Sequence, residues 1–222
     1  MPGQFLELAL STDEVLADCA GYEQLGFVAA QTGDVWPHHY GVMACHGLCI
    51  ALHGLPAAPP TLVFTRENVA ALARELDARG LQPTQMRLGS DVFNELSLHD
   101  PAGNRVRVLE ARTFTPPVAP AVTRLGRFEA LSLPCDDVAH SRDYWQQLGF
   151  VADSDTAGDL SVLRGGGLVL MLHPRAQAGA PLLRFGPVRE GQTLTRYTLP
   201  AQLLALSGSA DINLDQGFSS WH

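Results

Sequence analysis

The sequence predicts an α+β protein built from tandem βαβββ modules, and two internal repeats and one hairpin motif support this prediction. Residues 7–27 match residues 130–150 without a gap, through shared Leu-x-Leu and Gln-Leu-Gly-Phe motifs. Residues 62–80 match residues 8–26. The segment 100–104, Asp-Pro-Ala-Gly-Asn, has the residue types of a tight turn between two short strands. Repeats of this kind indicate one supersecondary unit that is used several times.

The first module follows from local signals in the order strand, helix and three strands. Residues 5–10 alternate in the manner of a half-buried strand. Ser11, Thr12 and Asp13 are capping residues and Gly26 is a terminator, so we predict a helix that runs to about Gln24. Three further strands are predicted at 27–30, 40–44 and 48–53.

The second and third modules repeat this order. In the second, a helix between Asn68 and Gly80 lies among strands predicted at 61–64, 85–88, 92–98 and 106–109. In the third, a helix from Asp136 to Gln147 lies among strands predicted at 128–133, 151–152, 160–163 and 168–172. A fourth module would occupy the last part of the chain, where the strand character is confined to 182–185 and 193–199 and a short helical turn is expected at 201–206. We therefore expect this last module to be incomplete or remodelled.

Proline-rich segments divide the chain into parts. We predict a two-module domain at 1–112, with modules at 1–56 and 61–112, then a linker at 113–126 and a third module with its irregular tail at 127–222. A module without a partner leaves a sheet edge uncovered, and such edges favour association. We therefore expect a homodimer in which third modules or tails complete one another.

Composition excludes several classes of protein. The net charge is −8, and all 15 basic residues other than histidine are arginine, so no lysine is present for Schiff-base chemistry. Basic clusters are absent, which argues against nucleic-acid binding. The sequence shows no signal peptide and no stretch long enough to span a membrane. Its four cysteines form no Cys-x-x-Cys pair, so we expect a cytoplasmic protein with free thiols.

The paired βαβββ order, the Leu-Gly-Phe helix ends and the Asp-Pro-x-Gly-Asn hairpin resemble the vicinal oxygen chelate superfamily. That group includes glyoxalase I, bleomycin-resistance proteins, fosfomycin-resistance enzymes and extradiol dioxygenases. The resemblance covers residues 5–111 and 127–174. It implies a glyoxalase-like fold, in which a curved sheet wraps around a cavity. In the enzymes of the group, inward residues of the first and last strands of each module hold a divalent metal there.

Carrying the metal positions over to this chain places them on residues that suit a metal poorly. They fall on Glu7, Ala51, Thr61 and Arg107, and in the third module on Ala130 and Met171. A hard divalent cation needs several carboxylate or imidazole donors, and a guanidinium is a hydrogen-bond donor only. We therefore expect the usual metal site to be lost and no cofactor to be needed. An ion pair between Glu7 and Arg107 would replace the metal as the tie between the strands.

Two classes of function stay open from the sequence. The first is a binding protein that resembles the bleomycin-resistance members and holds a small apolar or aromatic compound. Its cavity candidates are Glu7, Trp36, Tyr40, Cys49, His53, Thr61 and Arg107. The second is a divalent-metal-dependent lyase or dioxygenase of the glyoxalase type with displaced ligands, for which Glu7, His53 and Glu95 form a candidate set. A third alternative is a degenerate module that serves as an assembly scaffold. An Arg107 that Glu7 does not neutralise would favour a small anionic or polar ligand instead.

Overall fold

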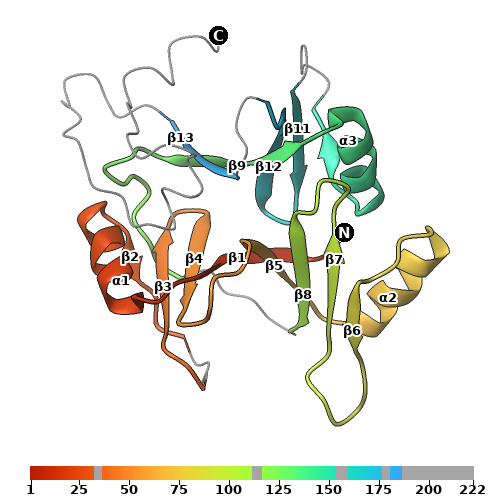
Figure 1. Cartoon of the computed structure of the whole chain (residues 1–222), viewed down its shortest axis with the longest axis horizontal. Helices are drawn as coiled ribbons and strands as arrows, with labels where there is room; N and C mark the ends of the chain where they lie inside the picture. Colours follow the sequence, from red (N-terminus) through yellow and green to blue (C-terminus); the bar gives the residue numbers. More distant parts are fainter. Residues whose placement is uncertain (33–36, 112–116, 154–159, 177–180, 187–222) are drawn as a thin grey trace.

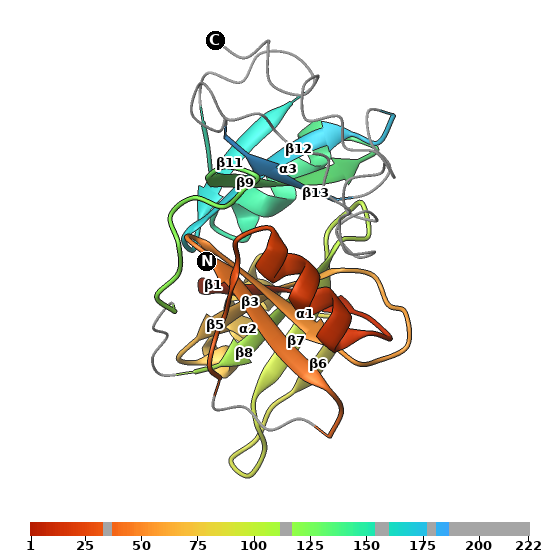
Figure 2. The same ribbon diagram turned by 90° about the vertical axis from the view of Figure 1, so that its left-hand side faces the viewer.

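The chain forms an eight-stranded sheet and a five-stranded sheet that lie in two layers (Figure 1, Figure 2). The computed structural model describes residues 1–32, 37–111, 117–153, 160–176 and 181–186. The larger sheet has the order β2-β3-β4-β1-β5-β8-β7-β6. Its strands are β1 (Gln4–Ser11), β2 (Val28–Ala29), β3 (Tyr40–Cys45), β4 (Leu48–His53), β5 (Thr61–Arg66), β6 (Gln85–Arg87), β7 (Glu95–His99) and β8 (Arg105–Glu110).

The strand order confirms the βαβββ modules. In each of the first two modules the first strand lies parallel to the last, as β1 pairs with β4 and β5 pairs with β8. The two modules join where β1 and β5 pair antiparallel at the centre of the sheet. Predicted strand limits are close to the observed ones, except that β7 begins at Glu95 and not at Val92.

Each module places one helix against its sheet: α1 (Val15–Gln24), α2 (Val69–Ala78) and α3 (Val138–Gln147). The second helix buries Val69, Leu72 and Leu76, which the helical spacing of its apolar residues predicts. Its first turn is capped by Asn68, whose side chain accepts a hydrogen bond of 2.7 Å from the backbone N–H of Ala71. None of the described helices is long and apolar enough to cross a membrane.

The five-stranded sheet holds the third module and the first strand of a fourth. Its order is β10-β11-β12-β9-β13. The strands are β9 (Phe128–Cys135), β10 (Val151–Ala152), β11 (Ser161–Gly165), β12 (Leu168–Pro174) and β13 (Leu182–Phe185).

Strand β13 repeats the position and the register of β5. Leu183 lies opposite Leu131, just as Leu62 lies opposite Leu8. In both pairs of strands the register then shifts, and beyond the shift two phenylalanines lie opposite each other. The sequence correctly predicted a strand at 182–185, and the structure adds that it begins a fourth module. The strand at 193–199 and the helical turn at 201–206 lie outside the described residues.

A single hydrophobic core joins the two sheets. The rings of Phe64 and Phe150 meet edge to face at a centroid distance of 6.2 Å. The indole N–H of Trp145, on α3, donates to a carboxylate oxygen of Asp100 at 3.2 Å. Asp100 also accepts the backbone N–H groups of Ala102 and Asn104, which fixes the predicted tight turn. The tight turn between β7 and β8 is therefore also a contact between the layers.

Candidate ligand-binding cavity

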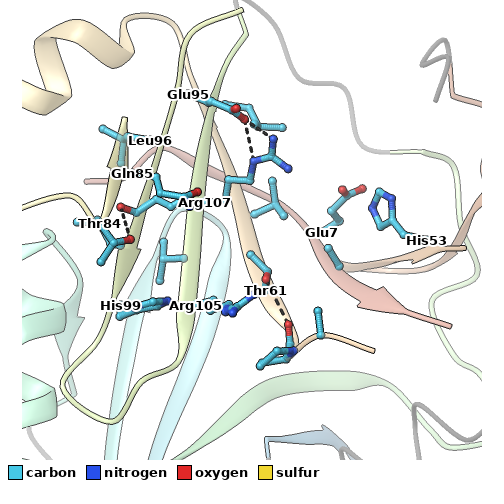
Figure 3. Close-up of a pocket in the computed structure, with 18 of the residues that line it drawn as sticks. Glu7, His53, Thr61, Thr84, Gln85, Glu95, Leu96, His99, Arg105 and Arg107 are labelled. Carbon is cyan, nitrogen blue, oxygen red and sulfur yellow. Dashed lines mark hydrogen bonds and ion pairs between the residues drawn. The ribbon is translucent and has the colours of Figure 1, made fainter. Parts of the chain in front are cut away.

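A cavity of about 610 Å³ lies on one face of the eight-stranded sheet (Figure 3). Alternate residues of a strand point to the same face, so each central strand contributes every second side chain. The walls include Glu7 and Ala9 from β1, Thr61 and Val63 from β5, Glu95 and Ser97 from β7, and Arg105, Arg107 and Leu109 from β8. The opposite face carries Leu8, Leu62 and Val106, which are buried in the core. The period of two therefore separates a polar cavity from an apolar core.

Glu7, Val63 and Arg107 form a row across the cavity wall. Glu7 is in register with Val63 on β5, and Val63 is in register with Arg107 on β8. Because β5 lies between β1 and β8, the backbones of Glu7 and Arg107 are two strand spacings apart, about 10 Å. Figure 3 shows Glu7 beside His53, away from the guanidinium of Arg107.

Arg107 has a different acidic partner from the one that the sequence predicted. Its Nε donates to Oε2 of Glu95 at 2.9 Å, and its Nη2 donates to the same oxygen. Glu95 lies on β7, the strand next to β8. Ser97 of β7 is directly opposite Arg107, and Glu95 is two residues from Ser97 on the same face of the sheet. The predicted ion pair of Glu7 with Arg107 is replaced by this pair, in which the carboxylate comes from the strand next to β8 and not from two strands away.

Histidine and tyrosine side chains gather beside Glu7 at the other side of the cavity. His38 Nε2 and His53 Nδ1 are 3.0 Å apart and share a hydrogen bond. The ring of Tyr40 lies on that of His53, with centroids 4.8 Å apart, and its hydroxyl donates to Glu7 at 3.5 Å. His53 therefore lies in the cavity wall. The sequence had left two positions open for it, the cavity wall and a solvent-exposed strand end.

Burial changes the acid–base properties of this region. Desolvation, with smaller effects of His38 and of the positive charge of Arg107, lowers the pKa of His53 to about 4. His53 is therefore neutral at pH 7. Burial also raises the pKa of the Cys49 thiol to about 11, and the nearby carboxylate of Glu7 adds to this effect. Cys49 is therefore a protonated thiol close to Glu7, with no nucleophilic character at neutral pH.

Some, but not all, of the predicted cavity residues line the cavity. Glu7, His53, Thr61 and Arg107 line the cavity. Tyr40 and Cys49 are not among the lining residues, although Tyr40 contacts both His53 and Glu7, and Trp36 lies outside the described residues. The sequence reasoning did not include Arg87 and Arg105, which also line the cavity, and it missed Glu95 as the partner of Arg107. The hairpin register that the turn at 100–104 fixes was the signal for Glu95, because it sets Ser97 opposite Arg107.

The residues at the metal positions do not fit a divalent metal. The carboxylate of Glu7 lies two strands from Arg107, whose guanidinium offers only donors. Ala51 provides no ligand atom, and Thr61 provides only a neutral hydroxyl, which donates to the carbonyl of Pro59 at 3.4 Å. Among the residues that the structure describes, no three His, Cys, Asp or Glu side chains gather as a metal site would require.

Comparisons with solved structures identify the fold. Catechol 2,3-dioxygenase is 18% identical with a TM-score of 0.51, and the match covers 75% of this chain and 65% of that one. The Mn(II)-bound glyoxalase from Novosphingobium aromaticivorans is 13% identical with a TM-score of 0.54, covering 81% and 63%. The E323L mutant of homoprotocatechuate 2,3-dioxygenase from Brevibacterium fuscum is 16% identical with a TM-score of 0.55, covering 78% and 53%. No protein-family profile and no curated protein matches the sequence.

These similarities confirm the resemblance at the level of the fold. The chain has the βαβββ architecture of the vicinal oxygen chelate superfamily, in which glyoxalases and extradiol dioxygenases occur. It spans between about half and two thirds of the length of these relatives. At 13–18% identity the fold says nothing of the reaction, which depends on the residues of the site.

Proposed function

We propose that this protein binds a small organic molecule in the cavity of the eight-stranded sheet, without the metal site of the related enzymes. The observation that carries the proposal is the Arg107–Glu95 ion pair in the cavity wall. At the position where enzymes of the group place a metal-binding glutamate, this chain places a guanidinium that its neighbour already holds. A cation at this position would face a positive charge, whereas an organic ligand finds an ordered donor.

The size and composition of the cavity support a small organic ligand. A volume of about 610 Å³ is within the range of small-molecule sites. Ala9 and Val63 supply apolar surface between the histidine side and the arginine side, and Leu109 adds to it on the arginine side. Polar groups at both sides are held by hydrogen bonds to neighbouring side chains, His53 by His38 and Arg107 by Glu95. Such a lining provides apolar contact for a ligand body and a few directed polar contacts for its substituents.

The test combines metal analysis with a variant that fills the cavity. We expect the purified protein to contain far less than one equivalent of Fe, Mn, Ni or Zn by mass spectrometry. Aromatic acids such as 2-naphthoate are expected to bind by isothermal titration calorimetry, before and after treatment with a chelator. Thr61→Trp should abolish this binding by filling the cavity, whereas the nearly isosteric Thr61→Val should preserve it.

Two results would overturn the proposal. Stoichiometric metal that the protein needs in order to bind the compound would favour a glyoxalase-type or dioxygenase-type enzyme with displaced ligands. Equal binding by wild type and by a folded Thr61→Trp variant would place the ligand outside the cavity. Thermal melting of both variants shows whether they are folded, and Ser97→Trp offers a second way to fill the same space.

A further inference from the structure

The charges that line the cavity are unbalanced toward the positive. Three arginines, Arg87, Arg105 and Arg107, face two carboxylates, Glu7 and Glu95. The whole chain has a net charge of −8, so this face differs in sign from the protein that carries it. Field lines concentrate in a concave site with low-dielectric walls, which raises the local concentration of ions of the opposite charge.

Within the described part of the chain, two of these guanidinium groups keep donors that no other side chain takes. Arg107 gives only its Nε and Nη2 to one oxygen of Glu95, so the outer edge of its fork remains for a second acceptor. Arg105 lies two residues away on the same face of β8. Among the described residues Arg105 forms no ion pair, and Figure 3 shows it extending from the strand beside His99. Both arginines line the cavity, Arg107 with its guanidinium beside Glu95 and Arg105 further along β8 beside His99.

The histidine side of the cavity does not attract an anion as the arginine side does. His53 is neutral at pH 7, and Glu7 lies beside it with the hydroxyl of Tyr40 at 3.5 Å. A negative group is therefore attracted to the arginine side and repelled by Glu7. Ala9 and Val63, on the strands between the two sides, provide an apolar surface for the body of the ligand.

We propose that the ligand is a small organic oxyanion, with an apolar or aromatic body over β1 and β5 and a carboxylate or phosphate group held by Arg105 and Arg107. Arginine binds both kinds of group through paired N–H donors. This inference rests on the proposed ligand-binding function and adds the chemical class of the ligand to it. It takes up the anionic alternative that the sequence left open for an Arg107 not neutralised by Glu7, and it adds Arg105 and an apolar body to that alternative.

The experiment compares an anionic with a neutral compound of the same shape. We expect 2-naphthoate to bind at least about tenfold more tightly than 2-naphthamide in calorimetry at low salt, because charge-assisted hydrogen bonds are lost in the amide. Arg105→Gln should weaken binding of 2-naphthoate by about tenfold and leave 2-naphthamide unchanged. Arg74→Gln, an exposed arginine on α2 away from the cavity, is the matched control and should change neither. The affinity of 2-naphthyl phosphate relative to that of 2-naphthoate shows whether the site prefers a phosphate or a carboxylate group.

The outcomes distinguish this inference from the function on which it rests. Equal affinity for acid and amide, with no effect of Arg105→Gln, would overturn the anionic ligand class and leave a ligand-binding cavity in place. Absence of binding by all three compounds would overturn both. A loss of affinity in Arg74→Gln equal to that in Arg105→Gln would show a general charge effect and would also contradict the inference.

Discussion

Arg107 and Glu95 are joined across the neighbouring strands β8 and β7 in the wall of the cavity. Nε and Nη2 of the guanidinium both donate to Oε2 of the carboxylate, and both side chains are partly exposed. The pair holds the guanidinium at one edge and leaves its other edge toward the cavity. It therefore orients a positive group where metal-dependent members of the superfamily use a carboxylate as a ligand.

Removing Glu95 should strengthen the binding of an anion while slightly weakening the fold. In Glu95→Gln the guanidinium of Arg107 keeps a neutral acceptor but loses its counter-charge. We expect affinity for 2-naphthoate to rise several-fold in calorimetry and the free energy of unfolding to fall by no more than about 1 kcal/mol, as for other solvent-accessible ion pairs.

The matched control for this change is Glu75→Gln. Glu75 pairs with Arg66 at 2.5 Å, and that pair has a similar exposure but lies outside the cavity. Its loss should lower stability by a similar small amount and leave the affinity unchanged. Unchanged or weaker anion binding in Glu95→Gln would show that Arg107 does not contact the ligand.

His53 should make folding stability depend on pH in mildly acidic solution. The folded protein protonates His53 only near pH 4, whereas the unfolded chain protonates it near pH 6.5. As pH falls from 6.5 toward 4, the unfolded chain binds a proton that the folded protein does not, so the free energy of unfolding decreases. Urea unfolding at pH 7 and pH 5 should show a smaller decrease in His53→Gln than in wild type.

A second histidine variant makes this measurement specific. His46 is exposed in the turn between β3 and β4, so His46→Gln should retain the pH dependence of the wild type. Equal pH dependence in His53→Gln and wild type would contradict the neutral state of the half-buried His53. A direct NMR titration of the imidazole should give a pKa near 4.

The repeats made most of the fold predictable from the sequence. Because each module repeats the same strand, helix and turn signals, one correct interpretation fixed the order of all three. The alternation of residues also placed Glu7, Thr61 and Arg107 on the face that lines the cavity. The homodimer and the domain limits remain predictions, and light scattering of the purified protein at micromolar concentration tests the first of them.

The partners within the cavity were harder to predict for a physical reason. Alternation along a strand gives the face of a residue but not the number of strands that separate it from another. Glu7 and Arg107 share a face and a row, yet Val63 lies between them. The neighbour relation of β7 and β8 was available from the hairpin, and it leads to Glu95. Arg87 depends on the pairing of the short edge strand β6 with β7, for which no turn motif gives the register.

The side-chain caps of α2 and α3 should contribute measurably to stability. Asn68 and Asp137 each accept a hydrogen bond from the backbone N–H three residues on, at 2.7 Å and 2.9 Å. Alanine at either position should lower the free energy of unfolding by about 1 kcal/mol. Glu14, at the same place on α1, makes no such bond, so Glu14→Ala serves as the control and should cost less than half as much. Equal losses in all three variants would show that the caps add nothing specific.

The contact between Asp100 and Trp145 should couple the two sheets energetically. The indole of Trp145 is fully buried and donates to a carboxylate oxygen of Asp100, which is itself buried in the turn between β7 and β8. Trp145→Phe removes this donor and some volume, so we expect a loss of about 2–3 kcal/mol in urea unfolding. A double-mutant cycle with Asp100→Ala should give an interaction energy of about 1 kcal/mol, because the two side chains share one buried hydrogen bond. Tyr144→Phe, on the same helix, is the comparison: the Tyr144 hydroxyl is buried without a hydrogen-bond partner among the described residues, so its removal should leave stability unchanged or raise it. An interaction energy of zero in the cycle would show that this hydrogen bond adds nothing to the coupling of the two sheets.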